Sequence, residues 1–163
     1  MRLPRIPKLP KNFWRKLLSI VTEEPSRLYM TIWHGKWTSV GGSLVHMNAS
    51  RLIRCKDDGC TTTHCMAGWA TFLTRGGLRL EVELSRMGSG DLYRLAERHG
   101  VDLYLGDGTT ACAAYLLLHK AGWSKHIMQS DFFSDNETAL EKIKHLAKVE
   151  ARRERDARRR ASA

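Results

Sequence analysis

Apolar side chains recur every three or four residues in several segments of this chain, and this spacing constrains the fold more than any other feature. Such a period places the apolar side chains on one face of an α-helix. The first segment follows Asn12, a residue that often caps helices, and runs from Phe13 to about Glu24, where Pro25 ends it. Further helices are predicted from Thr62 or Thr63 to Gly76, from Asp91 to Gly100, from Thr109 or Thr110 to Lys120, and from Ser134 onward.

Strand signals are fewer and shorter. Residues 28–33 are rich in aromatic and β-branched side chains, residues 34–37 resemble a turn, and a short strand is predicted at 43–47. Residues 78–84 alternate strictly between apolar and polar, which favours a strand with one solvated face. With 163 residues, the chain is long enough for one domain but not comfortably for two. We therefore predict a mainly α, small single-domain helical protein with minor β structure.

The formal net charge of +10 is concentrated at the two ends of the chain. Residues 1–16 contain six basic residues and no acidic one, and residues 142–163 contain nine basic residues and three acidic ones. The apolar pattern of the last helix stops after Val149, so the remainder is expected to project as a basic helix. The predicted organisation is a basic Pro-rich arm at 1–11, a globular domain at 12–149 and an Arg-rich tail at 150–163.

The N-terminal arm repeats the order basic, apolar, proline in Arg2-Leu3-Pro4, Arg5-Ile6-Pro7 and Lys8-Leu9-Pro10. Proline disfavours helix for the residue before it, so an extended arm is expected. With three residues per polyproline turn, the basic, apolar and proline side chains would each form a separate edge. Such an arm suits an aromatic-lined groove on a partner or an anionic channel, and a stiff solvated leader is the alternative.

Three cysteines and one histidine lie within eleven residues, which raises the question of a zinc site. The candidate ligands are Cys55, Cys60, His64 and Cys65, and the completing ligand would come from Cys112, His34 or His46. The spacing argues against zinc, because four residues separate consecutive cysteines and no second closely spaced pair follows.

Cys65 is also a candidate nucleophile or redox residue. A thiol in the first turn of a helix has its pKa lowered by the helix dipole, and the adjacent His64 could act as a base. A disulfide between Cys60 and Cys65 is a further option. Against these roles stands a buried cysteine that acts as a small apolar side chain.

The segment from Cys60 to Trp69 resembles the Cys-Gly-Thr-x-x-Cys-x-Ala-Gly-Trp segment of small uncharacterised proteins of bacteriophages and bacteria. Thr61 stands where that pattern has glycine, and the stretches Met30–Trp33, Leu105-Gly106 and Phe132-Phe133 are similar in order. The resemblance covers the middle two-thirds of the chain without either basic end. It implies a phage or prophage setting and carries no activity, cofactor or site residue.

The two basic ends provide the leading functional prediction, a non-enzymatic accessory protein of phage or mobile-element origin. It would bind nucleic acid or a nucleoprotein complex by contacts to phosphate, with little sequence preference. The predicted contact residues are Arg2, Arg5, Lys8, Lys11, Arg152, Arg153, Arg155, Arg158, Arg159 and Arg160.

Two alternatives remain open at this point. One is a protein-interaction module that docks on a host factor through the proline arm or a surface around Trp33 and Trp37. The other is a small zinc-binding or thiol-dependent protein built on the cluster from Cys55 to Cys65.

No cofactor is predicted apart from the zinc ion of that alternative. No apolar run approaches the ~20 residues of a membrane helix, so we expect a soluble protein of the bacterial host cytoplasm without a membrane partner.

Overall fold

Helices dominate the computed structural model, which describes residues 3–37, 43–55 and 62–162. The α-helices are α1 (Phe13–Glu23), α2 (Ala49–Cys55), α3 (Met66–Leu73), α4 (Gly77–Ser85), α5 (Ser89–His99), α6 (Thr109–Lys120) and α7 (Asn136–Ala161). The strands are β1 (His34–Trp37), β2 (Leu44–His46) and β3 (Thr62–His64), and short 3-10 helices cover Pro25–Arg27, Leu105–Asp107 and Gln129–Phe133. The predicted mainly α class with minor β structure is confirmed.

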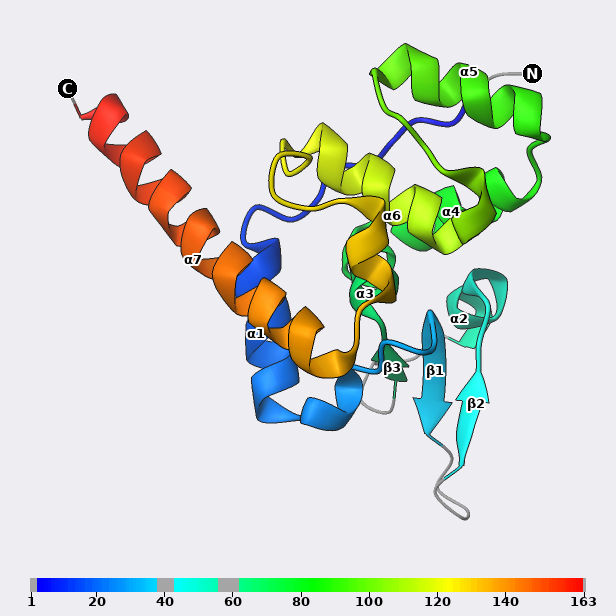
Figure 1. The fold of residues 1–163 in the computed structure, drawn as a ribbon, viewed down its shortest axis with the longest axis horizontal. Helices are drawn as coiled ribbons and strands as arrows, with labels where there is room; N and C mark the ends of the chain where they lie inside the picture. Colours follow the sequence, from blue (N-terminus) through cyan, green and yellow to red (C-terminus); the bar gives the residue numbers. More distant parts are fainter. Residues whose placement is uncertain (1–2, 38–42, 56–61, 163) are drawn as a thin grey trace.

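The three strands form one small antiparallel sheet in the order β2-β1-β3, at one end of the molecule (Figure 1). Across the sheet His34 pairs with His64, and Gly35 pairs with His46. The strand predicted within 43–47 is confirmed as β2.

The strand predicted at 28–33 is wrong, because the strand begins at His34, where a turn was expected. The earlier segment makes only an isolated bridge between Leu28 and His64 of β3, with the amide of Tyr29 donating to the carbonyl of His64. The amide of Met30 donates to the side chain of Asn136, and the amide of Ile32 donates to the carbonyl of Tyr29. Aromatic and β-branched composition favours a half-buried pleated surface but does not choose the strand partner.

The strand predicted at 78–84 is also wrong, because these residues form α4. The alternating pattern contains Leu80 and Leu84, which are four residues apart and therefore share one helix face. Both are buried, while Arg79 and Glu83 form an exposed pair with 3.4 Å between Nε and Oε1. Packing of α4 against α2, α3 and α6 selects the helix over the strand.

The helix expected to start at Thr62 or Thr63 starts later, at Met66, and ends at Leu73. The two threonines belong to β3, and Cys65 is the N-cap, with its Sγ accepting from the amide of Gly68 at 3.3 Å. A Cβ atom at Gly68 would lie 1.8 Å from the carbonyl oxygen of Trp33, so only glycine permits this close approach of α3 to the backbone before β1.

The remaining helices agree with their local signals. Helix α1 ends one residue before the expected Glu24, α5 ends at Gly100 in the left-handed conformation with φ 62°, and α6 starts at Thr109. Helix α7 is capped by Asp135, one residue after the expected cap, and its carboxylate accepts from the amide of Thr138 at 2.7 Å.

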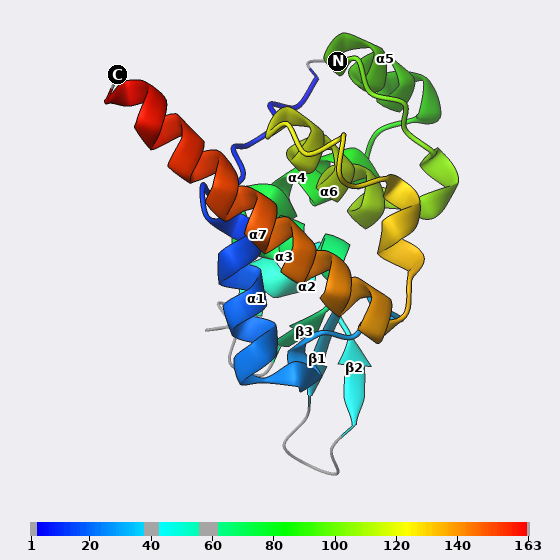
Figure 2. The same ribbon diagram turned by 60° about the vertical axis from the view of Figure 1, so that its left-hand side comes forward.

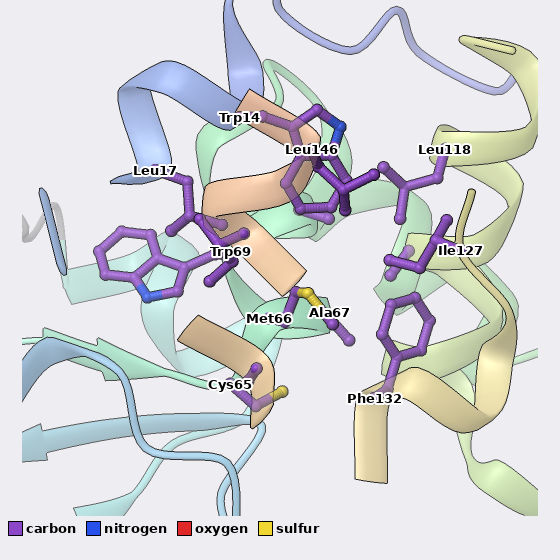
Figure 3. Close-up of a cluster of buried hydrophobic side chains, with 14 of the residues drawn as sticks. Trp14, Leu17, Cys65, Met66, Ala67, Trp69, Leu118, Ile127, Phe132 and Leu146 are labelled. Carbon is purple, nitrogen blue, oxygen red and sulfur yellow. The ribbon is translucent and has the colours of Figure 1, made fainter. Parts of the chain in front are cut away.

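Two clusters of buried side chains form the core. The first lies between α1, α3, α6 and α7, and Figure 3 shows Trp14, Trp69 and Phe132 among its large side chains. The second lies between α4, α5, α6 and the N-terminal arm. Tyr115 on α6 packs against both clusters, so α6 lies between them.

Residues 3–10 form neither helix nor strand, as expected for the proline arm. The apolar edge faces inward: Ile6 is 2% exposed within the second core cluster, and Leu3 and Leu9 pack against it. Arg5 and Lys8 are exposed. The apolar residues of the arm therefore meet the body of this same chain, and its basic residues face outward. None of the described helices combines the length and hydropathy needed to span a bilayer.

Candidate nucleic-acid interface

Helix α7 is held against α1 by a buried carboxylate. Glu150 accepts from the backbone amides of Trp14 at 3.2 Å and Arg15 at 3.0 Å, in the first turn of α1. These amides have no partner within their own helix, so the carboxylate caps α1 from across the fold. Burial raises the pKa of Glu150, while the hydrogen bonds from Arg15 and Trp14 act in the opposite direction. Asn12, the cap expected from sequence, makes no side-chain capping bond.

Beyond Glu150 the helix extends past the rest of the molecule, as the red end of the ribbon shows in both views (Figure 1, Figure 2). The segment from Glu150 to Ala161 is about 18 Å long at the rise of an α-helix. Its arginines Arg152, Arg153, Arg155, Arg158, Arg159 and Arg160 are all exposed. The structure therefore places all six predicted arginines on one projecting element.

One of these arginines also contacts the body. The guanidinium of Arg153 lies 4.1 Å from the centroid of the Trp123 ring and donates to the carbonyl of Gly122 at 3.1 Å. The other five arginines make no ion pair or side-chain hydrogen bond with any described residue. Of the acidic residues in this segment, Glu154 forms an ion pair with Arg15 of α1. The unpaired charge of the projecting segment is consequently almost all positive.

The predicted contact residues of the arm are separated from this element along the chain. Arg5, Lys8 and Lys11 are exposed, and Arg2 lies outside the described residues. Lys11 lies two residues before the start of α1, whose Arg15 pairs with Glu150 and Glu154 of α7. The end of the arm and the base of the projecting helix therefore meet at the first turn of α1.

The structure describes the side chains of only two of the four candidate zinc ligands, His64 and Cys65. Cys60 and the side chain of Cys55 lie outside the described part of the chain. His64 and Cys65 are buried, and their polar atoms contact His34 and Gly68. Within residues 3–37, 43–55 and 62–162, no three histidine, cysteine, aspartate or glutamate side chains are grouped as metal ligands would be.

The helix start does not lower the pKa of Cys65 as expected. Burial is the largest effect and raises the pKa of the thiol to about 12, outweighing the lowering by the amides of Gly68 and Ala67. A neutral thiol at ordinary pH is a poor nucleophile. Cys65 is thus a helix cap inside the core. Cys112 is also buried, and its Sγ donates to the carbonyl of Tyr104 at 3.8 Å.

Sequence reasoning missed a buried polar network around His34. Its Nε2 lies 3.0 Å from Oε2 of Glu81, and its Nδ1 lies 2.8 Å from Nδ1 of His64. The hydroxyl of Thr110 donates to Oε1 of Glu81 at 2.6 Å. Glu81 was expected on the solvated face of a strand, and no local pattern connects it with histidines on β1 and β3.

One assignment of protons satisfies these contacts. With neutral rings, Nε2–H of His34 donates to the carboxylate, and its Nδ1 accepts from Nδ1–H of His64. Nε2 of His64 then carries a lone pair, and it has no partner among the described residues. Both rings are fully buried, and the network joins β1, β3, α4 and α6. Glu81 also lines a pocket of about 250 Å³.

Comparisons with known proteins add no relative: no family matches this chain, and no curated protein or solved structure is significantly similar to it. The resemblance to small phage and bacterial proteins stays a prediction. The function of this protein is therefore inferred from its own sequence and geometry.

Proposed function

We propose that this protein binds nucleic acid through phosphate contacts made by the projecting end of α7, with the basic residues of the N-terminal arm as a secondary surface. The observation that carries the proposal is the placement of five exposed arginines without an acidic partner on a helix that extends past the body. Arginine guanidinium groups are always charged and match phosphate oxygens in paired hydrogen bonds.

The positions of the basic residues along α7 support a phosphate-tracking surface. Lys148, Arg152, Arg155 and Arg159 follow one another at spacings of three or four residues and are all exposed. This spacing places them on the helix face opposite Glu150, which faces α1. A straight basic edge of this kind can follow the charged backbone of a duplex.

The composition of the segment supports binding without strong sequence preference. After Glu150, α7 contains only alanine, arginine, glutamate and aspartate. The segment lacks the amide side chains that recognise adenine in paired hydrogen bonds, while its arginines can pair with guanine as well as with phosphate. Contacts to phosphate position a protein on nucleic acid but carry no sequence information.

The alternative of docking on a host protein has less support. The apolar edge of the arm, which a partner groove would need, is already buried in this chain at Ile6. Trp33 is partly buried, with its ring 5.3 Å from that of Phe133. The side chain of Trp37 lies outside the described residues.

The test compares two variants of equal charge. In the α7 variant, glutamine replaces Arg152, Arg155, Arg158, Arg159 and Arg160; in the control, glutamine replaces Arg51, Arg54, Arg79, Arg86 and Arg94, all exposed on α2, α4 and α5 or beside them. Arginine and glutamine have similar helix propensities, so both folds should persist. Binding of fluorescent duplex DNA and RNA is followed by anisotropy across a salt series.

We expect the α7 variant to lose at least about tenfold in affinity near 0.1 M salt, because each lost phosphate contact also removes about 0.9 from the log–log salt slope. The control should lose much less, since only net charge has changed. Equal losses in the two variants, or wild-type binding that is independent of salt, would contradict the proposal.

A further inference from the structure

The N-terminal arm is fixed to the body by three contacts at two consecutive residues, Ile6 and Pro7. Ile6 is buried in the second core cluster, and its carbonyl accepts from the ammonium of Lys120 at the end of α6. Pro7 lies against the turn before α4, where a Cβ atom at Gly76 would be 3.5 Å from its Cγ. These contacts fix the backbone of the arm and therefore the positions from which the side chains of Arg5 and Lys8 extend.

A pocket of about 360 Å³ opens at this crossing. It is lined by Arg5, Ile6, Pro7, Lys8, Arg75 and Lys120. A second hollow of about 230 Å³ shares Lys8 and Lys120 and continues along the arm to Leu9 and Ala121. The two hollows flank the same pair of lysines, so they form one groove beside the arm.

The charge of this groove is uncompensated. Four of the six lining residues of the larger pocket are cationic, and none is acidic. Arg5, Lys8, Arg75 and Lys120 form no ion pair with any residue in the described part of the chain. Positive charges gathered in a concave site cost free energy through mutual repulsion, which an anion relieves.

The cations of the larger pocket come from separate parts of the chain: Arg5 and Lys8 lie on the arm, Arg75 lies in the turn before α4, and Lys120 ends α6. Docking of the arm is therefore what assembles this positive site.

We propose that this pocket is a binding site for a phosphate ester, distinct from the arginines of α7. Two phosphate oxygens can accept from Arg75 and Arg5, while Lys8 and Lys120 neutralise the remaining charge as point cations. The phosphate comes either from a nucleic-acid backbone or from a free nucleotide. The site deepens the secondary surface of the proposed function, because it joins Arg5 and Lys8 of the arm to Arg75 and Lys120 of the body, and it does not depend on the projecting helix.

The decisive variant is the pair Lys8→Gln and Arg75→Gln, which leaves Ile6, Pro7 and Lys120 in place. Lys8 and Arg75 are exposed, so the fold should be retained. The matched control is the pair Arg54→Gln and Arg86→Gln, which removes the same charge away from the pocket. Isothermal titration with sodium pyrophosphate and with a short DNA duplex provides two independent measurements, and thermal unfolding checks the fold of each protein.

If the site takes free phosphate esters, the pocket variant binds pyrophosphate at least tenfold more weakly than the control. If the site takes backbone phosphate, pyrophosphate binds poorly to every protein, and the pocket variant loses at least fivefold more duplex affinity than the control. Equal behaviour of the pocket variant and the control with both titrants overturns the proposal.

The α7 variant separates this site from the proposed function. It should bind pyrophosphate as the wild type does, because its substitutions leave the pocket intact. If it also keeps full duplex affinity, the proposed role of α7 fails while the pocket stands.

Discussion

His64 is the residue whose environment departs most from what its sequence position indicates. It is fully buried, with its ring centroid 4.6 Å from that of Trp69 and 4.4 Å from that of Phe72. Burial lowers its pKa well below the ordinary 6.5, and the neighbouring His34 and Arg27 add to the effect. In the folded protein the ring is therefore neutral under conditions that protonate it in the unfolded chain.

The fold should lose stability as the pH falls below about 6.5, the ordinary pKa of histidine. Because the folded pKa is lowered, the unfolded state binds the extra proton, so this contribution is complete above 6.5 and is lost below it. The slope for one such group is at most about 1.4 kcal/mol per pH unit. Urea denaturation between pH 7.5 and 5 measures it.

His64→Asn is the control for that measurement, since its amide can replace Nδ1 toward His34 but does not titrate. The less buried His99 and His126 also have lowered pKa values and titrate in both proteins. A steeper loss in the wild type is expected. Identical slopes would show that His64 does not control the pH dependence.

At the scale of elements, the pairing of α1 with α7 depends on one side chain. Glu150 supplies the N-terminal cap of a helix that precedes it by more than a hundred residues. The same carboxylate marks the point where α7 leaves the body, so one residue both caps α1 and anchors the proposed binding helix.

Glu150→Ala should destabilise the protein by about 2 kcal/mol, because the buried amide of Trp14 would lose its acceptor. Alanine preserves the helix propensity of α7. Glu154→Ala is the matched control, and its ion pair with the exposed Arg15 should contribute about 1 kcal/mol or less. Urea denaturation distinguishes the two variants, and an equal effect of both would argue against the capping role of Glu150.

At the scale of the whole molecule, the N-terminal arm belongs to the core. Ile6 is buried in the second cluster, to which α4 contributes Leu80 and Leu84 and α6 contributes Leu116. An arm held in this way presents Arg5 and Lys8 as part of a shaped surface rather than as a free tail.

Ile6→Ala should destabilise the protein by about 2–4 kcal/mol, the usual cost of truncating a buried aliphatic side chain. Arg5→Ala, at the exposed neighbouring position, should change stability by no more than about 0.5 kcal/mol. Thermal and urea unfolding both measure the difference. A negligible effect of Ile6→Ala would mean that the arm is detached in solution.

The candidate site was predictable to the extent that it depends on composition. The exposed arginines of α7 follow from a segment that has no large apolar residue to bury, and the exposed cations of the arm follow from its repeated order of basic, apolar and proline residues. Arg75 and Lys120 could not be assigned to the same pocket, because they join Arg5 and Lys8 only through the docking of the arm. The network of His34, His64 and Glu81 was equally hidden from local patterns.

The sequence by itself determined the helices α1, α5, α6 and α7 and the non-helical course of residues 3–10. Their signals are contacts and caps between residues a few positions apart, which any conformation of the surrounding chain allows. The tertiary structure alone decided that 78–84 is a helix, that the strand begins at His34 and that Glu150 caps α1. In each case the deciding hydrogen bonds or packing contacts come from segments that are distant in the sequence. The free energy of these contacts exceeds the small local preference for the other conformation.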